Sequence, residues 1–85
     1  MTPKRLLSRL AASQSNVAFS DLVRLAVALG FRQDRTKGSH RIFVHRAHTE
    51  AMLNLQPDRG QAKPYQVRQL LKLAEAYNLR LDEEP

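Results

Sequence analysis

Gly30 separates two regions of this sequence in which the hydrophobic residues follow different spacings. Before Gly30, apolar residues recur every three or four positions, which is the spacing of one face of a helix. From Phe31 to Leu55, short runs rich in β-branched and aromatic residues lie between turn residues, which is typical of strands. A chain that changes its hydrophobic period in this way is expected to fold as an α+β domain.

Two helices are expected before the change of period. Thr2 can cap a first helix that ends near Ala12. Ser20 is expected to cap a second helix, and Gly30 to end it, because glycine adopts the left-handed conformation that follows many helices. The buried stripe of the second helix is expected to contain Leu22, Leu25, Ala26 and Leu29.

Three strands and one helix are expected after Gly30. The strands are predicted at 31–35, 40–45 and 52–55, with a tight turn at 37–39 that contains a glycine. A final helix begins near Pro64, and its buried positions are expected to be Val67, Leu70, Leu71 and Ala74. The expected architecture is a three-stranded antiparallel sheet with helices on one face and the other face open.

Charge indicates the kind of partner. The 85 residues, enough for one domain, include 14 Lys and Arg against 8 Asp and Glu, for a formal net charge of +6. Three of the acids lie together at 82–84, so the rest of the chain is more basic still, as in proteins that bind nucleic acid. No apolar run approaches the roughly 18 residues that span a bilayer, so no membrane association is expected.

The segment 32–48 combines positive charge with groups that can exchange protons. It contains five cations, one acid and all three histidines of the chain. Histidine is the side chain that titrates near neutral pH without perturbation, so it suits metal-free cleavage of a phosphodiester. His40 follows the predicted turn and is therefore expected to be exposed and rigidly held.

Strand alternation suggests how His40 is oriented. His40 and Ile42 share one face of their strand and Phe43 lies on the other. We expect Phe43 to face the helices because it is the largest apolar group of the strand, which places His40 on the open face. The five aromatic residues are mostly expected in the core, which favours recognition of backbone and shape over base stacking.

Neither a metal site nor a bound cofactor is expected. The chain has no cysteine, so disulfides and thiolate metal ligands are excluded, and this composition suits a reducing compartment. His45 and His48 could be imagined as a metal pair, but Glu50 is the one acid near them and their other neighbours are cationic.

Two stretches, LGFRQDRTKGSHRIF and LNLQPDRGQAKPYQVRQLLKLAEAYNL, resemble the HicA family of bacterial toxin–antitoxin toxins. The likeness covers roughly residues 19–81. Its most specific elements are the Gly38-Ser39-His40 turn followed by Phe43, and the stretch 60–71. The resemblance implies a fold similar to the double-stranded-RNA-binding domain, with the order α-β-β-β-α. It divides the chain into an N-terminal helix and connector at 1–18, a catalytic domain at 19–81 and an acidic tail at 82–85.

The same resemblance implies a cytoplasmic bacterial endoribonuclease that cleaves mRNA and is neutralised by a HicB-type antitoxin. The catalytic histidine of the family falls on His40. We expect His40 to act as general base or acid, with five further residues contacting RNA or its phosphates: Arg35, Lys37, Ser39, Arg41 and Lys63. The alternatives are a non-catalytic RNA-binding module that uses the same hairpin face and an adaptor whose basic surface binds an acidic protein.

Overall fold

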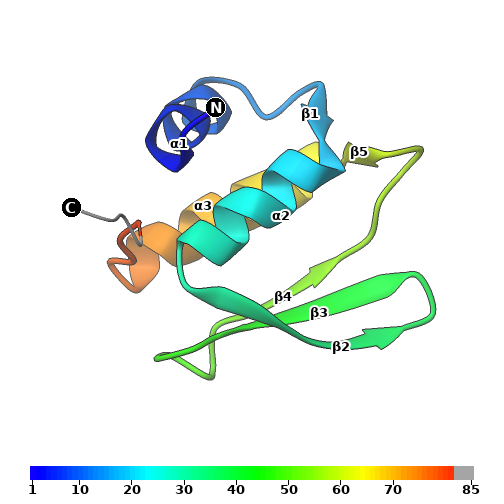
Figure 1. Cartoon of the computed structure of the whole chain (residues 1–85), viewed down its shortest axis with the longest axis vertical. Coiled ribbons are helices and arrows are strands. Elements are labelled where there is room, and N and C mark those ends of the chain that lie inside the picture. Colours follow the sequence, from blue (N-terminus) through cyan, green and yellow to red (C-terminus); the bar gives the residue numbers. More distant parts are fainter. Residues whose placement is uncertain (82–85) are drawn as a thin grey trace.

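The computed structural model describes residues 1–81 and contains three helices and five strands (Figure 1). The elements are α1 (Pro3–Ala12), β1 (Val17–Ala18), α2 (Phe19–Ala28), β2 (Phe31–Lys37), β3 (His40–His45), β4 (Met52–Leu55), β5 (Gln61–Ala62) and α3 (Pro64–Ala76). Apart from the two-residue strands β1 and β5, their order is the predicted one. The α+β fold, similar to the double-stranded-RNA-binding domain, is therefore confirmed. The predicted acidic tail at 82–85 lies outside the described residues.

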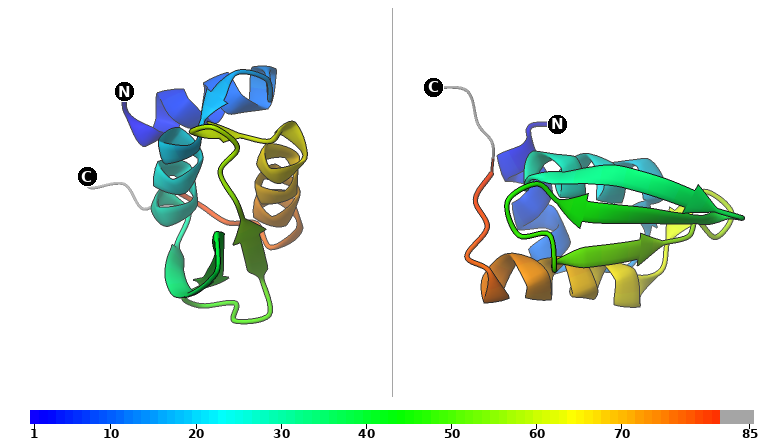
Figure 2. Two further views of the ribbon diagram at one scale, coloured as in Figure 1. Left: turned by 90° about the vertical axis from the view of Figure 1, so that its right-hand side faces the viewer. Right: turned by 90° about the horizontal axis from the view of Figure 1, so that it is seen from below.

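The domain has three layers (Figures 1 and 2). Strands β2, β3 and β4 form an antiparallel sheet in that order, and α2 and α3 cover one of its faces. Helix α1 lies on the far side of the helical layer, against α2. The core between these layers consists largely of Leu6, Leu10, Leu22, Leu25, Leu29, Phe31, Phe43, Leu53, Leu55, Val67 and Leu70.

A two-stranded ladder joins the starts of the two long helices. Strand β1 immediately precedes α2, β5 immediately precedes the N-cap of α3, and the strands pair with Val17 opposite Ala62. The helices consequently run side by side from the same end of the molecule, which is also the end of the β2–β3 turn (Figure 1). Strands of two residues have no alternation that a sequence could reveal, and both were missed.

The start of α2 differs from the prediction. The helix begins at Phe19, and Ser20, predicted as the cap, lies inside its first turn. The N-cap residue, Ala18, supplies no side-chain hydrogen bond; instead the backbone N–H of Phe19 donates to the carbonyl of Gly60 at 2.9 Å. Pairing of β1 with β5 thus supplies a contact that a serine cap would otherwise give. The predicted end is confirmed, since Gly30 follows the helix with a φ of 104°.

The two faces of β3 have different roles. Phe43 is 1% exposed and lies in the core below the helices, as predicted. Ile42 and Val44 point to the other face and lie outside the core cluster, yet they are also buried. Their cross-strand partners on β2 are Arg35 and Arg32, whose aliphatic stems can cover apolar neighbours while the guanidinium groups stay in water. This outer face is therefore a small apolar strip bordered by cations.

Candidate active site

The turn between β2 and β3 places His40 at an exposed end of the sheet. Lys37 pairs with His40 across the two-residue loop, and Gly38 at its first position has a φ of 64°. A positive φ at that position fits a type II′ turn, which matches the twist of the flanking strands. His40 itself is exposed, and its side chain lies on the face of the sheet away from the helices.

Asn54 on β4 holds the ring of His40. The Nδ1 atom of His40 lies 2.9 Å from Oδ1 of Asn54. Because an amide oxygen can only accept a hydrogen bond, Nδ1 carries the proton in this pair. In the neutral ring, the other nitrogen, Nε2, then keeps its lone pair. This arrangement fixes both the tautomer and the orientation of an exposed imidazole.

A second chain of hydrogen bonds anchors the same turn. The side-chain amide of Gln56 donates to Oγ of Ser39 at 3.0 Å. The carbonyl of Gln56 accepts from Nε2 of Gln66 at 3.3 Å, and Gln66 is buried in the first turn of α3. Ser39, predicted to contact RNA, is thus engaged with the end of β4. The turn beside His40 is tied to both β4 and α3.

The predicted cations on β2 differ in how freely they can reach a phosphate. Arg35 contacts Asp34 at 2.6 Å, and Arg32 contacts the same carboxylate at 3.2 Å, so Asp34 offsets part of their charge. Lys37 has no acidic partner within 4 Å among residues 1–81. It is also directly across the turn from His40. Lys37 is therefore the cation best placed beside the imidazole.

The structure does not bring Arg41 together with His40. Arg41 points to the helical side of the sheet, where its guanidinium lies 5.1 Å from the ring centroid of Phe19 in a cation–π contact. It lines a surface pocket at the start of α2 with Ser20 and Arg24, among others. Lys63 is the N-cap residue of α3 and is half-buried. Both belong to the same end of the molecule as His40, but on the helical side.

The other two histidines have structural surroundings. His45 is buried; its Nε2 donates to the carbonyl of Leu29 at 3.0 Å, and its Nδ1 accepts from the N–H groups of Ala47 and His48 at 3.0 and 3.1 Å. With both nitrogens occupied, His45 has none left for substrate. His48 is half-buried between the rings of His45 and Tyr77. Within residues 1–81, no three His, Asp or Glu side chains gather as a metal site would require.

Sequence reasoning missed Asn54 and Gln56. Asn54 lies on the outer-facing side of β4, and Gln56 lies just beyond the end of this strand. The buried Leu55 separates them. A signal was present, since a polar residue that alternates with buried leucines must face away from the core. What the sequence could not give was the register between β3 and β4, which places Ile42 opposite Asn54 and so brings His40 within reach of it.

Taken together, the site is an exposed imidazole with a fixed tautomer, held at the end of a basic hairpin on an α+β domain. Such a site can exchange a proton and attract a phosphate. The family described as the HicA toxin of bacterial toxin–antitoxin systems matches residues 19–76, well over half of the chain. The protein therefore belongs to the HicA toxin family, and α1 lies outside the matched region.

No curated protein and no solved structure shows a significant match to the chain. None of the helices described in residues 1–81 is long and apolar enough to cross a membrane.

Proposed function

We propose that this toxin is an endoribonuclease that cleaves mRNA without a metal ion, with His40 as its catalytic residue. The observation that carries the proposal is the His40–Asn54 contact, because it leaves Nε2 of an exposed imidazole available as a proton acceptor. Membership of the HicA toxin family supports the assignment to a toxin–antitoxin system. The net charge of +6 supports a polyanionic substrate.

The reaction begins with the ribose. Nε2 of His40 removes the proton from a 2′-hydroxyl, and the resulting oxygen attacks the adjacent phosphorus. Asn54 accepts the hydrogen bond of Nδ1–H throughout and stabilises the imidazolium that forms. DNA lacks the attacking group and is not cleaved.

The phosphate then gives up its 5′-linked oxygen. Lys37 stabilises the negative charge that develops on the non-bridging oxygens, since it lies across the turn from His40. The P–O5′ bond breaks, the leaving oxygen takes a proton from solvent, and the products are a 2′,3′-cyclic phosphate and a 5′-hydroxyl. The imidazolium returns its proton to water.

The antitoxin would neutralise this site by covering the β2–β3 hairpin. A HicB-type protein with an acidic contact surface fits the cations of β2, among them Lys37, which has no acidic partner within 4 Å in the part of the chain that the structure describes. The toxin would act in the bacterial cytoplasm, where its mRNA substrate is translated.

The test is cleavage of single-stranded RNA in EDTA by the parent protein, His40→Ala and His48→Ala. We expect the parent and His48→Ala to form cyclic-phosphate products, and His40→Ala to be slower by about 10²–10⁴-fold. RNA with 2′-O-methyl groups should resist cleavage. The proposal fails if His40→Ala cleaves at the parental rate. Binding of RNA by the parent without cleavage would instead favour the non-catalytic RNA-binding module.

A further inference from the structure

Of the five aromatic residues, Tyr65 is the one that does not pack in or against the hydrophobic core. Phe19, Phe31 and Phe43 are buried, and Tyr77 is half-buried against His48. Tyr65 is 54% exposed. A ring this exposed buries little apolar surface and so contributes little to folding. Its surroundings, in contrast, relate it to the candidate active site.

Hydrogen bonds connect the ring of Tyr65 to the turn that carries His40. The hydroxyl of Tyr65 lies 3.5 Å from Nε2 of Gln66, and the same nitrogen donates to the carbonyl of Gln56. The side chain of Gln56 in turn holds Ser39, the residue before His40. Gln66 is 1% exposed, so the group beside the Tyr65 hydroxyl is fixed in place.

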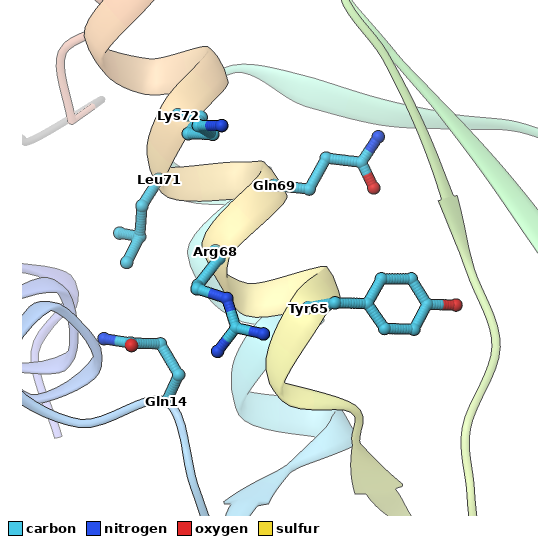
Figure 3. A pocket seen from close by; sticks show the side chains of 6 residues that line it. All are labelled: Gln14, Tyr65, Arg68, Gln69, Leu71 and Lys72. Carbon is cyan, nitrogen blue, oxygen red and sulfur yellow. The ribbon is translucent and has the colours of Figure 1, made fainter.

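The topology places this ring one strand away from the catalytic imidazole. His40 is on β3, which pairs with β4, and Tyr65 approaches the end of β4 from α3. Strand β4 forms one edge of the sheet, so a single strand bound at His40 on the outer face can pass around this edge to reach the ring of Tyr65 on the helical side. Figure 3 shows the ring of Tyr65 pointing away from α3 and from Gln14, toward the strand side of the helix.

The helix surface next to Tyr65 is suited to a nucleotide. Arg68 and Lys72 follow at three and seven positions along α3, so they continue along the same side of the helix. These three residues line a surface pocket together with Gln14, Gln69 and Leu71 (Figure 3). The pocket lining contains two cations and two amides but no acid. Cations can bind phosphate and amides can bind the edge of a base.

We propose that Tyr65 is a base-stacking residue that gives the toxin its preference for single-stranded RNA and sets where the chain lies relative to His40. The inference rests on the proposed function, which supplies RNA as the substrate. An unpaired nucleobase of the bound strand stacks on the ring of Tyr65, and Arg68 contacts a phosphate of the same strand. Stacking requires an unpaired base, so duplex RNA gains nothing from Tyr65.

The experiment measures binding in the His40→Ala background, where the RNA stays intact. The chain has no tryptophan and two tyrosines, so tyrosine emission can be followed directly. Titration with a 12-nucleotide single-stranded RNA should quench this emission. Adding Tyr65→Phe should abolish most of the quenching but keep the affinity within about 2-fold, since a phenyl ring still stacks. Adding Tyr65→Leu should weaken binding by about 5-fold to 100-fold.

Two controls define what would overturn the proposal. Tyr77→Phe removes the other tyrosine and should leave both the quenching and the affinity in place. A 12-base-pair RNA duplex should bind equally well to the Tyr65→Leu variant and to its parent. The proposal is overturned if Tyr65→Leu binds single-stranded RNA as tightly as the parent, or if the loss is the same for duplex RNA.

The experiments distinguish a failure of the stacking role of Tyr65 from a failure of the nuclease proposal. If the active protein cleaves RNA but Tyr65→Leu leaves KM and kcat unchanged, the stacking role is wrong and the nuclease proposal stands. If no RNA is cleaved yet single-stranded RNA binding depends on Tyr65, the nuclease proposal is wrong and the stacking contact stands.

Discussion

Nδ1 of His40 and Oδ1 of Asn54 lie 2.9 Å apart on neighbouring strands, although fourteen positions separate the two residues in sequence. They are diagonal neighbours, since Asn54 pairs directly with Ile42, two residues after His40. An exposed histidine on its own samples several rotamers and both tautomers. The amide of Asn54 selects one of each, so the orientation of the His40 ring depends on a residue of another strand.

Replacing Asn54 should therefore lower the rate of cleavage without unfolding the protein. Asn54 is exposed, so Asn54→Leu should change the free energy of unfolding by less than about 0.5 kcal/mol. We expect it to reduce kcat by about 10-fold to 100-fold, the usual consequence of a misplaced catalytic group. Single-turnover cleavage of RNA measures this effect.

Asn54→Asp is the matched control, because a carboxylate oxygen can accept the same hydrogen bond from Nδ1–H. It should keep most of the activity that Asn54→Leu loses. Equal rates for Asn54→Leu and the parent would mean that His40 needs no orienting partner.

Two of the cations predicted to contact phosphate, Lys37 and Arg41, should differ in how much their replacement by alanine lowers the rate of cleavage. Lys37 faces His40 across the turn, whereas Arg41 lies over Phe19 on the other face. We expect Lys37→Ala to lower kcat/KM for RNA by about 10-fold, through loss of charge stabilisation at the phosphate. Arg41→Ala should have less than about a 3-fold effect at the same ionic strength. Steady-state kinetics at fixed salt decide between them, and a larger loss for Arg41→Ala would move the phosphate to the helical side.

The sequence predicted the elements whose pattern is local. Gly30 marked the end of α2, and the limits of β3 and β4 were predicted correctly from residue type and spacing. Strand β2 runs two residues beyond its predicted end, because pairing with β3 extends it up to the turn. Ser20 was wrongly predicted as a cap because the contact at the start of α2 comes from Gly60, a residue distant in sequence.

The same distinction between local patterns and contacts of distant residues applies to the candidate site. His40 was proposed from its place after a glycine turn in a basic segment and from the resemblance to the HicA family, and its catalytic role stays a prediction. Its partner Asn54 could not be identified, because that contact depends on strand register. Arg41 was grouped with His40 by closeness in sequence, although adjacent residues on a strand face opposite sides. The exposure of Tyr65 also depends on tertiary packing, since α3 buries its neighbour Gln66 instead.

Two glycines with positive φ should respond differently to alanine. A Cβ at Gly30, with a φ of 104°, would lie 2.5 Å from Nε2 of His45, the atom that donates to Leu29. A Cβ at Gly38, with a φ of 64°, would meet nothing within 4 Å. Gly38→Ala should therefore cost about 1–2 kcal/mol of stability, from backbone strain alone.

Gly30→Ala should cost more than about 3 kcal/mol, because the buried ring of His45 must also move and its hydrogen bonds must weaken. Urea denaturation of the two variants measures the difference. Equal losses would show that the approach of His45 to Gly30 is not tight in solution.

Helix α1 is outside the family match, and its contribution should be to stability rather than to cleavage. Leu6 and Leu10 are each 1% exposed and belong to the core, which a chain of this size cannot easily give up. We expect Leu10→Ala to lower the free energy of unfolding by about 2–5 kcal/mol. Ser8→Ala, an exposed position of the same helix, should change it by less than about 0.5 kcal/mol.

The substitution Leu10→Ala should lower the stability of the protein without lowering the cleavage rate of its folded molecules. The helical layer separates α1 from the sheet (Figure 1). His40 lies on the outer face of that sheet, opposite to the core residue Phe43. Denaturation curves give the folded fraction of Leu10→Ala, and its kcat per folded molecule should equal that of the parent. A fall in kcat under conditions where the variant is fully folded would instead mean that α1 acts on the site through α2 and the sheet.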